Sequence, residues 1–301
     1  RAVVTLSALF VFHPLAVWLV MLVNVVLLVI VLVLEGRAPN PFETDRLIAP
    51  RSSFFVDSSY HLLHHVYPHQ YYSSMVRAFD WLFGYGCQFE GKRVLITGGS
   101  GALGKPMQEL LKKEGVASVR ALKFGKDWDY SNYAIFDELL PETDILILAH
   151  GSKMEHAQEA NCDSFVTVIE KFRREAETRL VPVEVWAVGS EIEAHPHFGV
   201  EELKIYKASK MAYARHARFY YNDRTLLYRH IVPSAFTSPM GPGLISGTTA
   251  AKIAMFFIRR GFHYVPVTYT GIAFLNWFKY LFALNATPAN PAPSQTAAAA
   301  S

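Results

Sequence analysis

Residues 93–104 read RVLITGGSGALG, and this stretch decides the fold. A short apolar run ends at Thr97, glycines recur at 98, 99, 101 and 104, and an amphipathic stretch follows through Lys113. Because glycine lacks a Cβ, the backbone of such a turn can approach a pyrophosphate closely, and the amides of the next helix stabilise its charge. Strand, glycine turn and helix in this order predict a dinucleotide site rather than an ordinary tight turn.

Further short apolar runs alternate with charged, helix-like stretches after Gly91. They are residues 118–122, 145–148 and 183–188. This alternation is typical of βαβ units, so the sequence predicts an α/β fold with a Rossmann-like doubly wound parallel sheet over residues 92–270. Ligands of such sheets lie beyond the carboxyl ends of the strands. We therefore expect Ser190 on the substrate side and the turn Ala149-His150-Gly151 under the cofactor.

The end of the 118–122 run bears on the choice of nicotinamide cofactor. Lys123 follows it, and no acidic residue stands at its tip. A carboxylate there would bind the ribose hydroxyls of NAD, whereas a basic side chain suits the extra phosphate of NADP. The sequence favours NADP(H) over NAD(H), with solvated surface lysines as the alternative. Asp129 closes a further expected short strand and either contacts the adenine ring or is a simple surface residue.

Tyr206 and Lys210 lie four positions apart in a helix-like stretch and are expected on the same helix face. An ammonium near a phenol favours the phenolate and would lower the pKa of Tyr206 from its usual value of about 10. Alone, the pair is as easily a core tyrosine beside a lysine with its charge in water. Together with the glycine turn and Ser190, it predicts a proton-transferring site.

These residues resemble the short-chain dehydrogenase/reductase family over residues 92–270. Thr97 to Gly104 matches the TGxxGxxG form, Tyr206 to Lys210 the YxxxK form, and Ala149-His150-Gly151 stands where the family has Asn-Ala-Gly. The resemblance implies four catalytic residues: Tyr206 as acid/base, Ser190 orienting the substrate oxygen, Lys210 binding the nicotinamide ribose, and Asn161 holding a proton-relay water. It also implies cofactor contacts. These are Thr97, Gly98, Ser100, Gly101, Leu103, Gly104, Lys123, Asp129, Ala149, His150, Gly151, Lys210, Pro233 and Thr237.

Two departures from the family pattern affect the mouth of the site. Ser190 precedes Tyr206 by 16 positions, more than is usual, with Ala194-His195-Pro196-His197 between them. Ser234 replaces the glycine that normally follows a proline such as Pro233.

The N-terminal residues 1–35 are strongly apolar. Leu15 to Leu34 is a run of 20 residues interrupted only by Asn24, which is long enough to cross a bilayer core of about 30 Å at about 1.5 Å per residue. We expect a transmembrane segment, with a buried core helix as the alternative, and a membrane location with the globular domain facing the cytoplasm. Because the chain begins with Arg1 rather than Met, we also expect residues to precede it.

Residues 36–91 form the expected juxtamembrane part. His61, His64 and His65 would share a helix face and could converge on one metal ion. The stretch Tyr60 to Gly86 resembles the last histidine box and closing segment of the membrane sterol desaturase/fatty-acid hydroxylase family, which uses several boxes around two irons. One box cannot hold two irons, so iron is expected only if further boxes lie upstream; an unrelated histidine-rich loop is the alternative.

At the other end, residues 271–284 are rich in aromatics and are expected to form a membrane-associated helix. Residues 285–301 are Pro/Ala-rich and are expected to be disordered.

Composition narrows the classes of function. The chain has 301 residues, of which 51% are hydrophobic and 18% charged, with a net charge of +3. A charge this small and dispersed gives no reason to expect nucleic-acid binding. Cys87 and Cys162 have neither disulfide nor zinc spacing and fit a reducing compartment.

The leading hypothesis is a membrane-associated NAD(P)-dependent oxidoreductase that moves hydride between nicotinamide and a carbonyl or secondary alcohol of a hydrophobic, lipid- or sterol-like substrate. A homo-oligomer is compatible with this reading. The alternatives are a fragment of a bifunctional enzyme with an iron-dependent hydroxylase or desaturase N-terminal part, and a cofactor-binding module without catalysis.

Overall fold

The computed structural model describes residues 14–35, 46–51, 54–154, 156–194 and 203–282. The chain divides into two compact units, Arg1–Asp45 and Arg46–Ser301. In the first unit, helix α2 covers Pro14–Glu35. Among the described residues, no helix has both the length and the apolar character needed to cross a membrane. The transmembrane prediction for Leu15 to Leu34 is therefore not supported by the structure. The predictions for residues 1–13, 36–45 and 285–301 lie outside the described residues.

The second unit is built on a parallel sheet of six strands, which confirms the predicted α/β, Rossmann-like fold. The strands are β1 (Arg93–Thr97), β2 (Ser118–Leu122), β3 (Ile145–Leu148), β4 (Glu184–Val188), β5 (Leu227–Pro233) and β8 (Tyr264–Val267). Their order is β2-β1-β3-β4-β5-β8, so the direction of strand addition reverses between β1 and β3. The strand expected before Asp129 does not form, because that segment makes only isolated bridges, Phe124 to Trp128 and Asp129 to Asn132.

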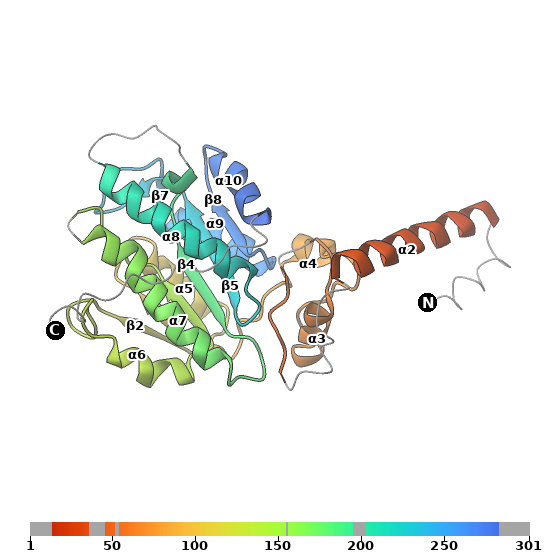
Figure 1. Ribbon diagram of the computed structural model, residues 1–301, viewed down its shortest axis with the longest axis horizontal. Helices are drawn as coiled ribbons and strands as arrows, with labels where there is room; N and C mark the ends of the chain where they lie inside the picture. The colour runs from red at the N-terminus through yellow and green to blue at the C-terminus, as the bar shows by residue number, and fades with distance from the viewer. Residues whose placement is uncertain (1–13, 36–45, 52–53, 155, 195–202, 283–301) are drawn as a thin grey trace, which may run out of the picture. The chain divides into compact units, whose positions relative to one another are not determined.

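Helices cover both faces of the sheet, and α7 and α8 lie across the face turned toward the viewer in Figure 1. The main helices are α5 (Gly104–Lys113), α6 (Ala134–Leu139), α7 (Ser164–Ala176), α8 (Lys204–Asn222), α9 (Gly247–Arg259) and α10 (Ile272–Leu281). α5 and α9 contribute Met107, Leu111 and Ala254 to one core cluster, which includes Ile96 of β1. α6, α7, α8 and α10 contribute to a second cluster, and a smaller third one lies around Tyr60.

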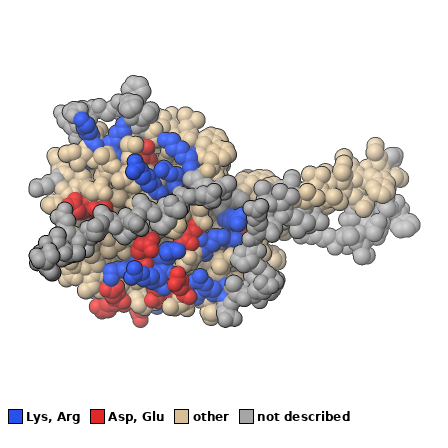
Figure 2. Space-filling model, viewed as in Figure 1, with Lys and Arg blue, Asp and Glu red and all other residues tan. Residues whose placement is uncertain are grey.

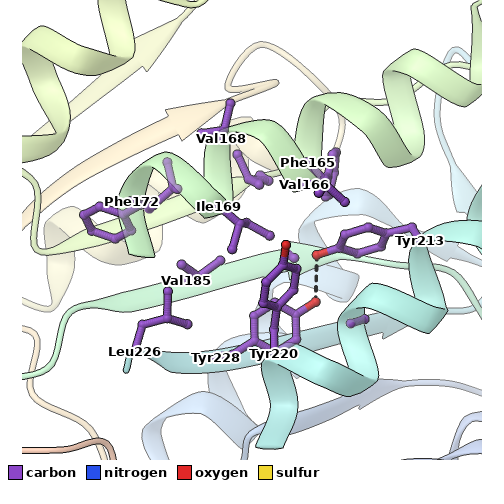
Figure 3. Packing of buried hydrophobic residues seen from close by; sticks show 14 of the residues in the cluster. Phe165, Val166, Val168, Ile169, Phe172, Val185, Tyr213, Tyr220, Leu226 and Tyr228 are labelled. Carbon is purple, nitrogen blue, oxygen red and sulfur yellow. Dashed lines mark hydrogen bonds between the residues drawn. The ribbon is translucent and has the colours of Figure 1, made fainter. Parts of the chain in front are cut away.

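The second core cluster fixes α7 and α8 against the middle of the sheet, as Figure 3 shows. Phe165, Ile169 and Phe172 of α7 are fully buried, at the i, i+4, i+7 spacing of one helix face. The hydroxyls of Tyr213 on α8 and Tyr228 on β5 are 2.7 Å apart, so each of these buried phenols has a hydrogen-bond partner in the other. This contact anchors the helix that carries Tyr206 and Lys210.

Short elements complete the unit. They are α3 (Ser58–Val66), α4 (Ala78–Phe83), the 3₁₀ helices η2 (Leu140–Glu142) and η4 (Glu191–Ala194), the π-helix η3 (Glu159–Asp163), and the strands β6 (Phe236–Thr237) and β7 (Ile245–Ser246). The described residues of 46–91 contact the sheet domain: Arg224, between α8 and β5, donates to Asp57 at 2.9 Å and to the Ala49 carbonyl at 2.9 Å. Cys87 and Cys162 are both free and buried.

Candidate active site

The carboxyl ends of neighbouring strands bring four connecting segments to one edge of the sheet. Thr97 of β1 pairs with Leu148 of β3, and Leu148 pairs with Ala187 of β4. The turns that follow these strands, together with the segment after Pro233 of β5, therefore lie next to one another. The edge lies beside the reversal of strand order, where ligands of doubly wound sheets bind.

The glycine turn between β1 and α5 is too tight for side chains. Gly98 has φ +69°, and a Cβ there would lie 2.5 Å from the Ala149 backbone. A Cβ at Gly104 would lie 2.2 Å from the Gly98 oxygen, and the Gly101 amide donates to that same oxygen at 3.0 Å. Ser100 is exposed at the tip and Leu103 is buried below it. The turn thus presents backbone at the start of a helix, as a phosphate cradle requires.

Replacing Gly104 by valine is expected to abolish nicotinamide binding and to destabilise the fold, because the new side chain would occupy the space of the Gly98 carbonyl. Titration with NADPH and NADH and a thermal melt would measure both effects. Glu109→Ala, on the exposed side of α5, is the matched control and should bind normally. Normal binding by the valine variant would show that this turn is not the cradle.

Thr97 and His150 face each other below the turn. The Thr97 hydroxyl lies 2.7 Å from His150 Nδ1, and His150 Nε2 lies 2.9 Å from the Ser164 hydroxyl. Burial, assisted by Lys210, lowers the pKa of His150 to about 3, so the ring is neutral. His150 thereby links Thr97 at the end of β1 to Ser164 at the start of α7. The Thr97 hydroxyl is used in this link. Ala149 and Gly151 flank His150 on the chain, with Gly151 exposed.

Asn161 lies in the π-helix η3, a local geometry that is frequent at functional sites. Its amide nitrogen donates to the carbonyls of Ser152 at 2.6 Å and Ala157 at 2.9 Å, and to the Ser209 hydroxyl at 3.1 Å. Its oxygen accepts from the Ser152 amide at 3.3 Å. The side chain therefore holds the turn after β3 against the residue that precedes Lys210.

The structure brings Ser190, Tyr206 and Lys210 together. Lys210 is buried and donates to the Val188 carbonyl at 2.9 Å, two residues before Ser190. Its Nζ lies 6.0 Å from the centre of the Tyr206 ring. Burial lowers the pKa of Lys210 to about 8, opposed by Glu193. A cation, a phenol and a hydroxyl thus share one edge of the sheet, as the sequence predicted.

The predicted lowering of the pKa of Tyr206 is wrong. The pKa of Tyr206 is raised, first because burial disfavours the phenolate, while a hydrogen bond with Ser190 opposes the rise and Glu193 adds to it. Desolvation outweighs the attraction of an ammonium whose distance from the ring centre is 6.0 Å. The phenol consequently keeps its proton at neutral pH.

Lys153 was not predicted, yet it lies beside the phenol. Its Nζ is 5.8 Å from the centre of the Tyr206 ring and donates to the Met240 carbonyl at 2.6 Å. This bond links the turn after β3 to the segment after β5 across the site. No local pattern around Lys153 signals it, because its partner lies 87 residues away.

Glu191 and Glu193, which follow Ser190, were also missed. Glu191 accepts from the hydroxyls of Ser234, Thr268 and Thr270, each at 2.6 Å. Glu193 is buried against the His230 imidazole at 3.0 Å. Both carboxylates anchor η4, and with it the position of Ser190.

The glutamates keep their charge in this environment. Burial alone would raise the pKa of Glu193, but His230 and the hydrogen bonds around the carboxylate hold it below its usual range. The same holds for Glu191, where hydrogen bonds from three hydroxyls outweigh burial.

The tip of β2 differs from the prediction. The Asp127 carboxylate accepts a hydrogen bond from the Lys123 amide at 2.7 Å. An acidic group therefore does lie beside Lys123, although none follows β2 directly in the sequence. The Asp129 carboxylate accepts from the Ser131 hydroxyl at 2.6 Å and from the amides of Ser131 and Asn132. The bonds with Ser131 chiefly lower the pKa of Asp129. This carboxylate therefore orders its own turn.

Pro233 and Thr237 lie on the segment that closes the edge after β5. Pro233 ends the strand and pairs with Val267 of β8. The Thr237 hydroxyl donates to the Gly243 carbonyl at 2.9 Å, and its strand β6 pairs with β7. Thr237 is exposed, so the segment forms a small ribbon at the rim of the site.

The three histidines of the predicted metal site do not converge. His61 and His65 approach through their Nε2 atoms at 3.3 Å, but His64 Nδ1 lies 2.8 Å from the Gln70 carbonyl instead. In the described part of the chain, no group of three or more His, Cys, Asp or Glu side chains is arranged to hold a metal ion. The described residues therefore do not support the expected metal site at His61, His64 and His65, nor the hydroxylase resemblance.

Solved structures share the fold of the second unit. A short-chain dehydrogenase from Burkholderia cenocepacia J2315 in complex with NADP matches with a TM-score of 0.52 and 17% identity, over 66% of this chain and 97% of that one. A short-chain dehydrogenase/reductase from Burkholderia phymatum in complex with NAD gives 0.50 and 13%, over 69% and 100%. A bulky-bulky ketone specific alcohol dehydrogenase from Comamonas testosteroni gives 0.50 and 12%, over 68% and 98%.

No protein-family model matches the chain. A curated relative, a monoglucosyldiacylglycerol epimerase from Synechocystis sp., is 24% identical over 266 residues, which is 79% of this chain. The chain spans 63% of the length of that relative. Taken with the solved structures, the second unit has the fold of the short-chain dehydrogenases/reductases, among which both NADP and NAD are bound.

Proposed function

We propose that the chain binds a nicotinamide dinucleotide and moves hydride between it and a carbonyl or secondary alcohol. The observation that carries this proposal is the meeting of Ser190, Tyr206 and Lys210 at the edge that also holds the glycine turn. Because Gly98 and Gly104 let the backbone pack closely, the turn places the start of α5 at this edge of the sheet with no side chain at these two positions, and the residues present fit a pyrophosphate there.

Each side chain has a distinct task in carbonyl reduction. A bound nicotinamide supplies the hydride that forms the new C–H bond. The Tyr206 phenol, protonated at neutral pH, donates its proton to the substrate oxygen as negative charge develops there. Ser190, hydrogen-bonded with Tyr206, orients that oxygen, and the buried Lys210 cation stabilises the phenolate left behind. Oxidation of an alcohol runs through the same groups in reverse.

We propose a hydrophobic, lipid-like substrate. Apolar side chains adjoin the site residues: Met154 next to Lys153 is 77% exposed, and Ile205 next to Tyr206 is 67% exposed. Met240, whose carbonyl holds Lys153, is also exposed. Exposed apolar groups around a polar site suit a substrate with a large apolar part.

Deuterium transfer tests the function directly. The full chain is incubated with NADPH or NADH deuterated at the transferred position and with a panel of lipid ketones, and the alcohols are examined by mass spectrometry. We expect one deuterium at the carbinol carbon. Cofactor binding with no transfer to any ketone would instead favour a binding module without catalysis.

The choice between NADP and NAD depends on the tip of β2. We propose NADP(H), because Lys123 is exposed there, although Asp127 stands beside it. Lys123→Asp is expected to weaken NADPH binding about tenfold relative to NADH, the size of one charge-assisted hydrogen bond. Lys112→Asp on α5 makes the same charge change away from the tip and is the control. An unaltered NADPH/NADH affinity ratio in the Lys123 variant would exclude this residue from cofactor selection.

A second candidate, supported by the curated relative, is epimerisation of a sugar carbon on a glycosylated diacylglycerol. The alignment of 266 residues is longer than the stretch 92–270, so the similarity extends beyond the sheet domain. The same phenol would take a proton from an alcohol and return it after the carbon is reduced on its other face. With monoglucosyldiacylglycerol as substrate, NMR would then show an inverted carbon without net consumption of nicotinamide. Stoichiometric consumption would favour the dehydrogenase reading.

A further inference from the structure

The outward face of α10 is apolar. Ala273, Asn276 and Tyr280 are buried against the body of the unit. Phe274, Leu275, Phe278 and Phe282 are 50%, 69%, 49% and 77% exposed. Phe274, Phe278 and Phe282 have the i, i+4, i+8 spacing of one helix face, and Leu275 lies three residues before Phe278. The rings of Phe278 and Phe282 stack with centroids 6.4 Å apart. A surface helix of a water-soluble domain normally places charged residues there.

The buried side of α10 is held by polar bonds that fix the rotation of the helix. Asn276 donates to Glu193 at 2.9 Å, and the Tyr280 hydroxyl donates to the same carboxylate at 3.1 Å. The Trp277 indole donates to the Tyr221 hydroxyl at 3.4 Å. Turning the helix to bury its phenylalanines would break the bonds of Asn276 and Tyr280 to the buried Glu193 carboxylate and leave it with His230, which is unfavourable for a buried charge. The apolar face therefore stays outward.

Cations border this face. A cavity of about 530 Å³ between α8 and α10 is lined by Met211, Ala214, Arg215, Arg218, Lys279 and Phe282, with Glu193 also contributing. Within the described residues, none of Arg215, Arg218 and Lys279 forms an ion pair with a carboxylate. Figure 2 shows Lys and Arg side chains gathered over α8, beside mainly uncharged surface where α10 lies.

We propose that this face docks on the surface of an anionic phospholipid membrane. Phe274, Leu275, Phe278 and Phe282 would enter the boundary between headgroups and acyl chains, and Arg215, Arg218 and Lys279 would meet the lipid phosphates. Large apolar residues flanked by unpaired cations are the composition of a helix that lies in the membrane interface. The inference deepens the proposed function, because a hydrophobic substrate would then come from the bilayer.

Two other occupants fit the face less well. A second copy of the chain, packed face to face, would bring the same three cations close to one another, and like charges across an interface are repulsive. The chain that follows Leu284 reads NATPANPAPSQTAAAAS and holds no large apolar residue with which to cover four exposed ones.

A local probe tests the docking independently of the apolar N-terminal segment, which could bind vesicles by itself. Phe278→Cys and Leu275→Cys in the full chain are each labelled with the fluorophore NBD, since Cys87 and Cys162 are buried. We expect brighter, blue-shifted emission and quenching by brominated lipids on phosphatidylcholine vesicles that contain phosphatidylglycerol. The response on phosphatidylcholine alone should be much weaker. A label on Leu180→Cys, at an exposed position elsewhere, should stay water-like.

Charge variants test the basic border. Arg215→Gln with Arg218→Gln should weaken docking about thirtyfold, because each cation near an anionic surface contributes a factor of about five. Arg120→Gln with Arg174→Gln makes the same charge change at exposed positions elsewhere and should have little effect.

Two results would overturn the proposal. One is vesicle binding with water-like emission from both probes on α10, which would assign binding to another part of the chain. The other is a blue shift that grows with protein concentration in the absence of lipid, which would assign the face to a second copy. Hydride transfer is measured in the same preparations without vesicles, so that the docking surface and the proposed function can fail separately.

Discussion

Tyr206→Phe is expected to lower the rate of hydride transfer by about 10²- to 10⁴-fold, the usual contribution of a positioned general acid. The substitution removes only the hydroxyl, so the half-buried ring keeps its packing and the glycine turn is untouched. Nicotinamide affinity should therefore be unchanged. Because burial raises the pKa of Tyr206, the wild-type enzyme holds the transferable proton through neutral pH, and reduction should fall as the pH rises past about 8, where the Lys210 ammonium that stabilises the phenolate is lost.

Single-turnover transfer of deuterium and nicotinamide titration measure the two quantities separately. Tyr269→Phe removes an exposed hydroxyl and serves as the control, which should transfer deuterium at the wild-type rate. A Tyr206 variant that retains the wild-type rate and pH profile would remove the phenol from the mechanism. Loss of nicotinamide binding in the same variant would assign the residue to the cofactor site instead.

Arg229→Met is expected to cost about 3–5 kcal/mol of unfolding free energy, a large part of the roughly 5–15 kcal/mol that stabilises a typical domain. Arg229 of β5 donates to Glu184 of β4 at 2.9 Å, and both side chains are buried. It also donates to the Phe262 carbonyl at 2.8 Å and to Cys87 Sγ at 3.4 Å. Removing the guanidinium leaves the buried Glu184 carboxylate with two neutral donors, the Trp186 indole at 2.9 Å and the Cys87 thiol at 3.7 Å.

Urea denaturation measures this loss, and the double variant Glu184→Gln with Arg229→Met is its control, since no charge is then left unpaired. The double variant should lose markedly less stability than Arg229→Met alone. Burial alone would raise the pKa of Glu184, but Arg229 outweighs it and holds the pKa below its ordinary value. The pair therefore stabilises the fold above the unfolded carboxyl pKa, and this contribution is lost as the pH falls through the folded one. Equal losses in both variants would contradict an unpaired charge as the cause.

The parts of the fold that follow from local pattern were predicted well. β1 and β2 have the predicted bounds. Each is a short apolar run that ends at a glycine or a charged residue, and this pattern is typical of a short strand. The expected strand before Asp129 failed, since Trp128 turns into the core beside Phe136 while the backbone around it forms only isolated bridges. Local pattern registers that a residue is apolar, but not whether its backbone has a neighbouring strand to pair with.

The candidate site divides in the same way. Ser190, Tyr206 and Lys210 could be predicted because strand ends and helix periodicity set their positions. Lys153, Asp127 and the two glutamates after Ser190 could not, because a short-range pattern does not show which way their side chains turn. The rise in the pKa of Tyr206 was missed for a related reason: sequence spacing shows the neighbouring charge but not the loss of water.

The sequence by itself determined the parallel sheet, the glycine turn and the phenol–ammonium pair, because each depends on residues a few positions apart. Only the tertiary structure decided what surrounds them. It directed His64 Nδ1 to the Gln70 carbonyl, it joined Glu193 to α10 across more than 80 residues, and it left phenylalanines of that helix facing outward. These outcomes depend on burial and on partners distant in the chain, which no local periodicity encodes.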